Sequence, residues 1–217
     1  FVAGGLKSLA NIEKISAQTE SVIKSTGGAA GVSSKHIDDY AQALEKKTGI
    51  EAESITTGQN LLLTFTDIRN SKLDKTFDKA TATALDMSVA LGTDMKSSSL
   101  LVGKALNDPI KGLTALSRVG VAFTQQQKDQ IKAMSASGDT LGAQKIILAE
   151  LNKEFGGSAD AFGKTTSGKV AKLKNAFGDV QEEIAAKLLP VGLKLLTWAA
   201  KSLPGALATA RTWFASL

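Results

Sequence analysis

Few residues in this chain combine a type and a spacing that could perform chemistry. Gly163-Lys164-Thr165 matches the end of a phosphate-binding loop, in which backbone amides and a lysine hold phosphate groups. The complete loop also needs a glycine where Ser158 stands, and Gly157 lies one residue too early. We therefore predict that this tripeptide does not bind phosphate.

Metal and nucleophilic chemistry have equally little support. The chain has one histidine, His36, and no cysteine, which excludes disulfides, thiolate ligands and a two-histidine metal site. We expect His36 on the surface in the first turn of a helix, not as a catalytic base. The acid pairs Asp38–Asp39 and Glu182–Glu183 are adjacent in sequence, as on solvated helix faces, and no Gly-x-Ser-x-Gly motif is present. The sequence predicts a protein that is not an enzyme and holds neither a cofactor nor a metal.

Nucleic-acid binding has a weak basis in the charge pattern. The net charge of +5 permits contact with DNA or anionic lipid without requiring it. Lys169, Lys172 and Lys174 form a basic cluster, but Asp179 and the 182–183 acid pair follow closely. No aromatic side chains alternate with these lysines, as a single-strand platform would need. A solvated helix face is the favoured interpretation, and DNA contact remains a weaker alternative.

The elements that must position these residues are predicted to be helices throughout. The chain is 43% hydrophobic with three prolines, and its Ala-, Lys-, Leu-, Gln- and Glu-rich stretches favour helix. Apolar residues recur at helical spacing, with glycines at the ends of the periodic stretches. Expected helical ranges are 6–25, 34–48, 51–68, 74–90, 96–106, 109–119, 124–137, 140–155 and 164–189. A strand is the alternative for the apolar run 61–65, since so short a run does not settle the period.

The start and stop signals are sharpest between residues 107 and 140. Asp108 is a strong N-cap and Pro109 suits the first helical position, while Gly120 ends that helix. After an extended apolar bridge that includes Phe123, Thr124 and Gln127 form a capping box. Gly138 ends the helix that follows, and Asp139 or Thr140 caps the next. These short connections predict αα-hairpins within one helical module, residues 1–160, with no fixed-period repeat.

A longer helix is predicted to follow in residues 161–189. Its apolar residues recur about every 3.5 positions, as a seam between associating helices requires. These seam residues are Val170, Leu173, Phe177, Val180, Ile184 and Leu188. The sequence therefore predicts a possible oligomer contact here.

The last region, residues 190–217, is basic, amphipathic and strongly apolar. Pro190 and Pro204 are expected to divide it into two helices, each with proline in its first turn. Its longest uncharged stretch is far shorter than the roughly 18 residues that a membrane span needs. Two interpretations stay open: a helix at a membrane surface or partner, or a helix that buries its apolar face in its own oligomer. The candidate contact residues are Lys187, Lys194, Trp198, Lys201, Arg211, Trp213 and Phe214.

Three segments resemble the tail tape measure proteins of long-tailed phages and prophages. They are LLLTFTDIRN (61–70), GKALNDPIKGLTALSRVGVAFT (103–124) and GDTLGAQKIILAEL (138–151), in that order and spacing, and the resemblance covers roughly residues 10–190. The middle segment is the most specific of the three. The residues that carry the pattern as structural positions are Asp108, Pro109, Gly112, Gly120, Phe123, Thr124, Gln127, Gly138 and Gln144.

The resemblance implies a structural virion protein that sets tail length and takes part in genome ejection. It implies several copies side by side in the tail lumen or at the tail tip, with three as the favoured number. Tail tube subunits, tail-tip or baseplate proteins and tail assembly chaperones are the implied partners, and the host membrane or envelope is an implied contact on infection. The alternatives are a membrane-active helical protein whose C-terminal basic helices insert, and a helical adaptor without catalytic activity.

Helix arithmetic then separates this chain from a straight ruler. As one helix its 217 residues would span on the order of 325 Å. The caps and glycines divide it into short helices instead, which predicts a compact module and not an extended rod. Because the sequence starts at Phe1, we also expect it to be a piece of a longer polypeptide.

Overall fold

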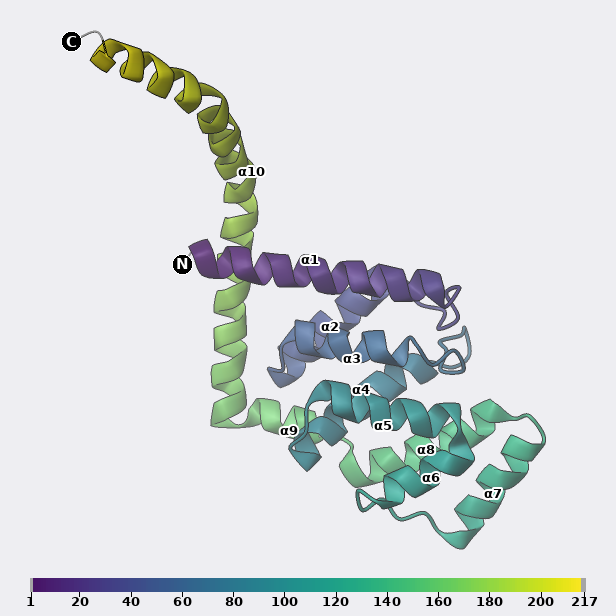
Figure 1. The fold of residues 1–217 in the computed structure, drawn as a ribbon. Coiled ribbons are helices and arrows are strands. Elements are labelled where there is room, and N and C mark those ends of the chain that lie inside the picture. The colour runs from purple at the N-terminus through teal and green to yellow at the C-terminus, as the bar shows by residue number, and fades with distance from the viewer. Residues whose placement is uncertain (1, 216–217) are drawn as a thin grey trace. The chain divides into compact units, whose positions relative to one another are not determined.

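The computed structural model describes the backbone of residues 2–215 and the side chains of residues 5–191, 194, 197–198 and 201. Within this part of the chain the secondary structure is helical, with one isolated bridge between Asn70 and Lys75 and no strand, so the all-α prediction is confirmed (Figure 1). The helices are α1 (Val2–Ser25), α2 (Ser34–Thr48), α3 (Ala52–Leu62), α4 (Thr76–Leu91), α5 (Met95–Asn107), α6 (Pro109–Ser117), α7 (Gln125–Ala136), α8 (Thr140–Phe155), α9 (Ser158–Lys164) and α10 (Thr166–Ala215).

The chain divides into two compact units, and each is described by itself. One unit comprises Phe1–Ile12 and Ala176–Leu217, and the other comprises Glu13–Asn175. The division therefore falls within α1 and within α10.

The larger unit is a stack of short helices around one apolar core. Helix α5 packs on α3, α4 and α6, while α8 packs on α4 and α7. Neighbouring helices along the chain pack on each other from α2 to α8, as expected for αα-hairpins. The largest fully buried side chains are Phe77, Ile37, Ile55, Leu62, Leu63, Ile68, Leu85, Met87, Leu106, Leu116, Ile131 and Ile147.

Local capping explains where most of these helices begin and end. The Ser33 side chain accepts a hydrogen bond from the His36 N–H at 3.1 Å, and Asp94 accepts one from the Ser97 N–H at 2.8 Å. Gly49 ends α2 at φ 81°, in the left-handed region that residues with a Cβ atom avoid. Of the two candidate N-caps for α8, Asp139 and Thr140, the structure has Asp139, whose side chain accepts a hydrogen bond from the Gly142 N–H at 2.9 Å.

The helix predicted for residues 51–68 ends six residues early, and the strand alternative for 61–65 is wrong. Helix α3 stops at Leu62 and the chain turns, with the Phe65 N–H donating to the Leu62 carbonyl at 3.0 Å. A continuing helix would spread this dense apolar run around its surface. The turn instead places Leu62, Leu63 and Ile68 in the core together.

The end of the chain differs most from the prediction. Residues 158–164 form a separate helix, α9, and Thr165 begins α10 by accepting a hydrogen bond from the Gly168 N–H at 3.0 Å. The expected helix ends at Pro190 and Pro204 are wrong, because α10 continues through both prolines to Ala215. A proline within a helix removes one hydrogen bond and displaces the carbonyl four residues earlier. Ala186, which carries that carbonyl for Pro190, is exposed, so water can satisfy it.

Candidate functional site

Gln144 connects all three of the segments on which the family resemblance depends. Its side chain is 1% exposed, and its Nε2 donates to the Leu106 carbonyl at 3.1 Å and to the Asp67 carbonyl at 3.0 Å. Gln144 lies in segment 138–151, Leu106 in 103–124 and Asp67 in 61–70. One buried amide therefore joins parts of the chain that are 38 and 77 residues from it in sequence.

The Leu106 carbonyl needs such a donor because α5 ends at Asn107. Carbonyls in the last turn of a helix have no partner within that helix. Pro109, three residues after Leu106, has no N–H to offer. Gln144 thus acts as a C-terminal cap supplied from α8.

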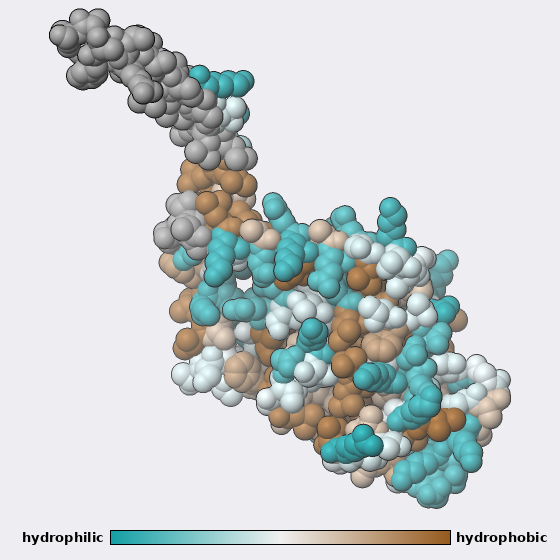
Figure 2. Space-filling model, viewed as in Figure 1, coloured by the Kyte–Doolittle hydropathy of each residue, from teal (hydrophilic) through white to brown (hydrophobic). Residues whose placement is uncertain are grey.

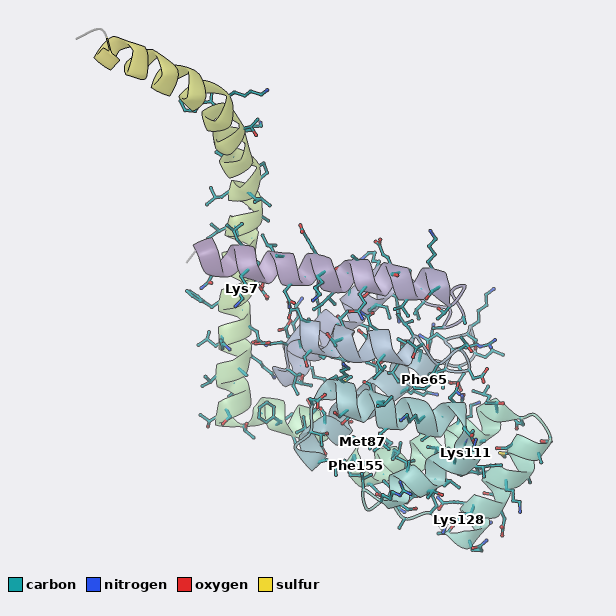
Figure 3. All side chains as sticks on the ribbon, in the orientation of Figure 1. Lys7, Phe65, Met87, Lys111, Lys128 and Phe155 are labelled. Carbon is teal, nitrogen blue, oxygen red and sulfur yellow. The ribbon has the colours of Figure 1, made fainter. Side chains whose placement is uncertain are left out.

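The segments 61–70 and 103–124 also meet at a second place. Phe65 lies where the chain leaves α3, beside α5 (Figure 3). A Cβ atom added at Gly103 would come within 2.2 Å of the Phe65 ring. The glycine in this motif is therefore explained by the close approach of an aromatic ring.

The motif residues Asp108, Pro109 and Gly112 together fix α6 against α5. The Asp108 side chain accepts from the Lys111 N–H at 3.2 Å, and Pro109 occupies the first helical position, as predicted. Hydrogen bonds from the Lys111 side chain and backbone lower the pKa of Asp108 below its ordinary value. A Cβ atom at Gly112 would lie 2.3 Å from the Ala105 Cα, so only glycine allows this approach of the two helices.

The predicted capping box forms at the start of α7 and also contacts α8. The Thr124 N–H donates to Gln127 at 2.7 Å, and the Gln127 N–H donates to the Thr124 hydroxyl at 3.2 Å. The Gln127 Nε2 also donates to the buried Glu150 carboxylate at 2.6 Å, which ties α7 to α8. Just before the box, Phe123 is buried in an extended segment, as the sequence indicated.

Gly120 and Gly138 complete the motif set as exposed turn residues. Their φ angles are 98° and 79°, and no atom lies within 4 Å of the positions where their Cβ atoms would stand. They redirect the chain at the ends of α6 and α7. The motif residues therefore share one role, which is to fix the geometry of α5 to α8.

The candidate contact residues near the C-terminus are only partly described. Lys187, Lys194, Trp198 and Lys201 are exposed on α10. Lys187 lies 2.7 Å from the Glu183 carboxylate, which offsets its charge. The side chains of Arg211, Trp213 and Phe214 fall outside the described residues.

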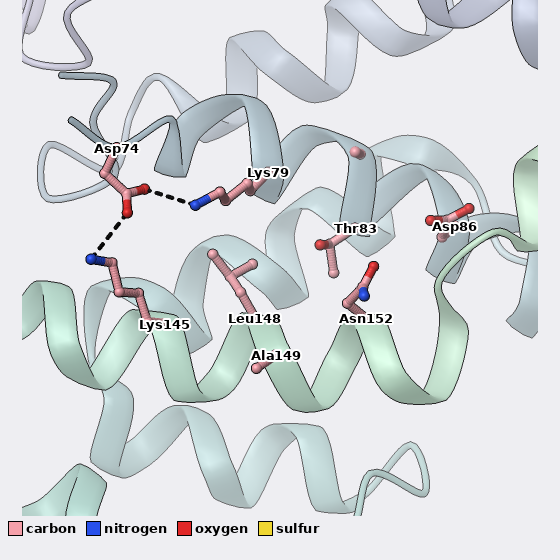
Figure 4. A pocket seen from close by; sticks show the side chains of 9 residues that line it. Asp74, Lys79, Thr83, Asp86, Lys145, Leu148, Ala149 and Asn152 are labelled. Carbon is pink, nitrogen blue, oxygen red and sulfur yellow. Dashed lines mark hydrogen bonds and ion pairs between the residues drawn. The ribbon is translucent and has the colours of Figure 1, made fainter. Parts of the chain in front are cut away.

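Sequence reasoning missed a groove between α4 and α8, which encloses about 390 Å³ (Figure 4). At one end the Asp74 carboxylate lies 3.2 Å from Lys79 Nζ and 3.1 Å from Lys145 Nζ. Burial alone would raise the pKa of Asp74, but hydrogen bonds from Thr76, Lys145 and Lys79 outweigh it and lower that pKa. Lys145 is 71 residues away in sequence, so no local pattern could indicate this cluster.

The opposite end of the groove holds the start of α9. Asp86 accepts hydrogen bonds from the Gly157 N–H at 3.1 Å and the Ala159 N–H at 2.9 Å. It therefore caps α9 from α4, where the sequence offers no adjacent capping side chain. Since the acids and lysines of the groove already have partners, its charges hold helices together.

His36 has a partner that the surface prediction did not include. It lies in the first turn of α2 as expected, but its Nε2 is 2.8 Å from the Asp78 carboxylate of α4. The Tyr40 hydroxyl donates to the Asp78 carbonyl at 3.2 Å, and burial raises the pKa of Tyr40 to about 12. These contacts join α2 to α4.

Within the described residues, no group of histidines and carboxylates is placed to hold a metal ion. No helix there is both long and apolar enough to cross a membrane. No protein-family model matches the chain, and neither a characterised protein nor a solved structure matches it.

Proposed function

We propose that this chain is a folded structural segment of a phage tail tape measure protein. The observation that carries the proposal is the contact at Gln144. Three segments that resemble this family separately in sequence are joined there by one buried side chain.

The proposed role is mechanical, and its partners are those of a tail. We infer that the segment belongs to a longer polypeptide in the tail lumen or at the tail tip. There it would contact tail tube and tail-tip proteins, after assembly with the help of chaperones. Its motif residues would maintain a fixed shape and perform no catalysis, since they cap helices and allow close helix approach.

A second candidate role, contact with the host envelope during ejection, is favoured by exposed residues in the second half of α10. Trp198 stands there with Lys194 and Lys201, and all three are exposed. An indole and two long cationic side chains suit the boundary between lipid and water. This role is compatible with a tail location before infection.

The tail assignment can be tested on particles from the strain that encodes the chain. Antibodies raised against the purified chain should label tails in immunogold electron microscopy, and peptides of the chain should appear in mass spectra of purified particles. Serum depleted with the purified chain is the control. Tails that carry neither the label nor the peptides would refute the proposal.

The folded character of the segment predicts a second, quantitative result. Residues 13–175 as one straight helix would span roughly 245 Å, whereas a compact unit of this size is about 40 Å across. Deleting this unit from the full polypeptide should therefore shorten the tail by tens of ångströms. A shortening near the straight-helix value would show that the segment is extended in the tail.

A further inference from the structure

The connection between α3 and α4 carries the most exposed large apolar side chain of the larger unit. Leu73 is 99% exposed, whereas Leu173, which comes next, is 73% exposed. Figure 2 shows apolar side chains among hydrophilic ones over much of the visible face of this unit, so partial exposure is ordinary here. Complete exposure is different, because Leu73 buries almost no surface and therefore contributes almost nothing to folding.

Hydrogen bonds within residues 71–75, which we call the Leu73 turn, hold the backbone in one conformation. The Ser71 N–H donates to the Asp74 carbonyl at 2.7 Å. The Ser71 hydroxyl accepts from the Leu73 and Asp74 N–H groups at 3.3 and 3.0 Å. Serine is a typical turn residue because its hydroxyl bonds to nearby backbone in this way, whereas a leucine side chain forms no such bond. Turn chemistry therefore explains Ser71 but not Leu73.

Two buried side chains fix the Leu73 turn to the rest of the larger unit. The Asn70 side chain accepts hydrogen bonds from two backbone N–H groups at the start of α4, and its own N–H donates to the loop after α1 at 2.8 Å. On the other side of the turn, the Asp74 carboxylate binds Lys79 of α4 and Lys145 of α8 (Figure 4). Leu73 is thus presented on a fixed base, and a partner would not have to order the turn on binding.

Lysines surround the exposed leucine. Lys72 and Lys75 are exposed on either side of it, and neither side chain has an ion-pair partner among the described residues. Lys79 and Lys145 are each more than half exposed and share one carboxylate, that of Asp74. Four lysines beside one carboxylate leave an excess of positive charge around the turn.

A pocket in another protein fits this arrangement better than a membrane does. One apolar side chain on a narrow, fixed turn can enter a pocket, and desolvated pockets are where single side chains contribute most to binding between proteins. Interfacial membrane segments instead spread several apolar or aromatic residues over a broad face, whereas the neighbours of Leu73 in the turn are all polar. The lysines around the turn are complementary to carboxylates on the partner.

We propose that the Leu73 turn docks into an apolar pocket of a partner protein, and that the rim of this pocket carries aspartate or glutamate. The proposal does not depend on the tail assignment, because it rests on the exposure of Leu73 and on the charge around it. Complete burial of the leucine accounts for roughly 10–100-fold in affinity. The lysines speed association and make the binding weaker as the salt concentration rises.

Photo-cross-linking in the strain that encodes the chain identifies the partner. p-Benzoylphenylalanine replaces Leu73 in the full-length protein, and in a matched strain it replaces Ile110, another exposed apolar residue, on α6. Ultraviolet light should produce a discrete adduct with a protein from position 73 and not from position 110. The cross-linked peptide of the partner should contain apolar residues with aspartate or glutamate close by.

The affinity of the purified chain for that partner is the second readout, because an adduct alone does not show which side chains bind. Leu73→Ser should raise Kd roughly 10–100-fold. Lys72→Glu combined with Lys75→Glu should raise Kd at least tenfold and reduce its dependence on salt. Ile110→Ser is the matched control and should bind as the wild type does. Since all four side chains are exposed, each variant should melt within about 2 °C of the wild type.

Several outcomes would overturn the proposal. One is the absence of a protein adduct from position 73, or the same adduct from position 110. Another is an adduct with phospholipid or with a second copy of this chain, since either would be a different occupant. The last is a partner that binds Leu73→Ser, or the double charge reversal, as tightly as it binds the wild type.

Discussion

Replacing Gln144 by methionine tests whether the buried amide holds the larger unit together. Methionine has nearly the same length and flexibility, so the packing changes little. The substitution removes both hydrogen bonds that Nε2 donates, to the Leu106 and Asp67 carbonyls. Any loss of stability therefore reports on those two bonds.

The size of the effect follows from the surroundings of the two acceptors. The bond to Leu106 is fully buried, so its carbonyl would lose its donor and gain no water, at about 1–3 kcal/mol. Asp67 is an exposed residue, and its carbonyl can recover part of its bond from solvent. We expect a total loss of about 2–4 kcal/mol in the free energy of unfolding.

Thermal unfolding measures this loss, provided that the two units are followed separately. A loss of this size in a unit of about 160 residues should lower its melting temperature by about 5–15 °C. The only tyrosine, Tyr40, lies in the larger unit and both tryptophans lie in the smaller one, so near-ultraviolet signals can separate them.

An exposed glutamine supplies the control for the change of residue type. Gln126 lies on the surface of α7, and Gln126→Met should change stability by less than about 0.5 kcal/mol. If Gln144→Met melts within a degree or two of the wild type, the three segments are not held together by this side chain. The structural argument for the family resemblance would then lose its main support.

Three further predictions concern other contacts of the larger unit. Gly112→Ala should lower the free energy of unfolding of the larger unit by about 1–3 kcal/mol in a denaturant titration, because the new methyl group meets the α5 backbone. Gly178→Ala, in the α10 part of the smaller unit and with open space around it, is the control for the change of residue type and should leave the larger unit's transition unchanged. Asp86→Ala removes the cap of α9 and should lower the free energy of unfolding by about 1–2 kcal/mol. Amide hydrogen exchange in the first turn of α9 should become faster, and unchanged exchange would contradict this prediction. Hydrogen bonds from Lys153 and Gln127 lower the pKa of Glu150, so its contribution is present at neutral pH and is lost as pH falls through that lowered pKa. Glu150→Gln should therefore flatten the acid limb of a stability–pH curve, and parallel curves would rule this out.

Local signals predicted most helix ends because capping involves neighbours in sequence. Asp108 and Thr124 each bond to a backbone N–H three residues later, so spacing alone identifies them. Thr165 caps α10 through the same spacing to Gly168. That signal was present in the sequence and was obscured by the lysine-rich helix pattern around it.

The contacts that define the site could not be predicted in this way. Gln144 bonds to residues 38 and 77 positions away, and Asp86 caps a helix more than 70 residues later. Residue type gives no indication of such pairs, since a buried glutamine looks like a surface glutamine in the sequence. The resemblance included Gln144 among its positions, but only the structure supplies its physical role.

The prolines of α10 show why helix propensity alone can mispredict a helix end when water can bind the carbonyl that loses its partner. A proline inside a helix costs about 3 kcal/mol relative to alanine, which normally ends the helix. Pro190 follows Ala185, Ala186, Lys187, Leu188 and Leu189, which favour helix. The carbonyl that it deprives of a partner is on Ala186, an exposed residue, so water can bind it. The helix therefore continues.

The folded core limits how far this chain could serve as a straight ruler. Straightening the larger unit into one helix would expose the large side chains now fully buried, among them Phe77, Leu106 and Ile147. At about 2 kcal/mol for each of about a dozen such residues, the loss would exceed 20 kcal/mol. Folded domains are stable by only about 5–15 kcal/mol, so a straight helix of these residues would not be stable alone in water. If ejection through the narrow tail straightens this unit, another apolar surface must receive these side chains, and neighbouring copies of the same chain would carry the most similar surfaces.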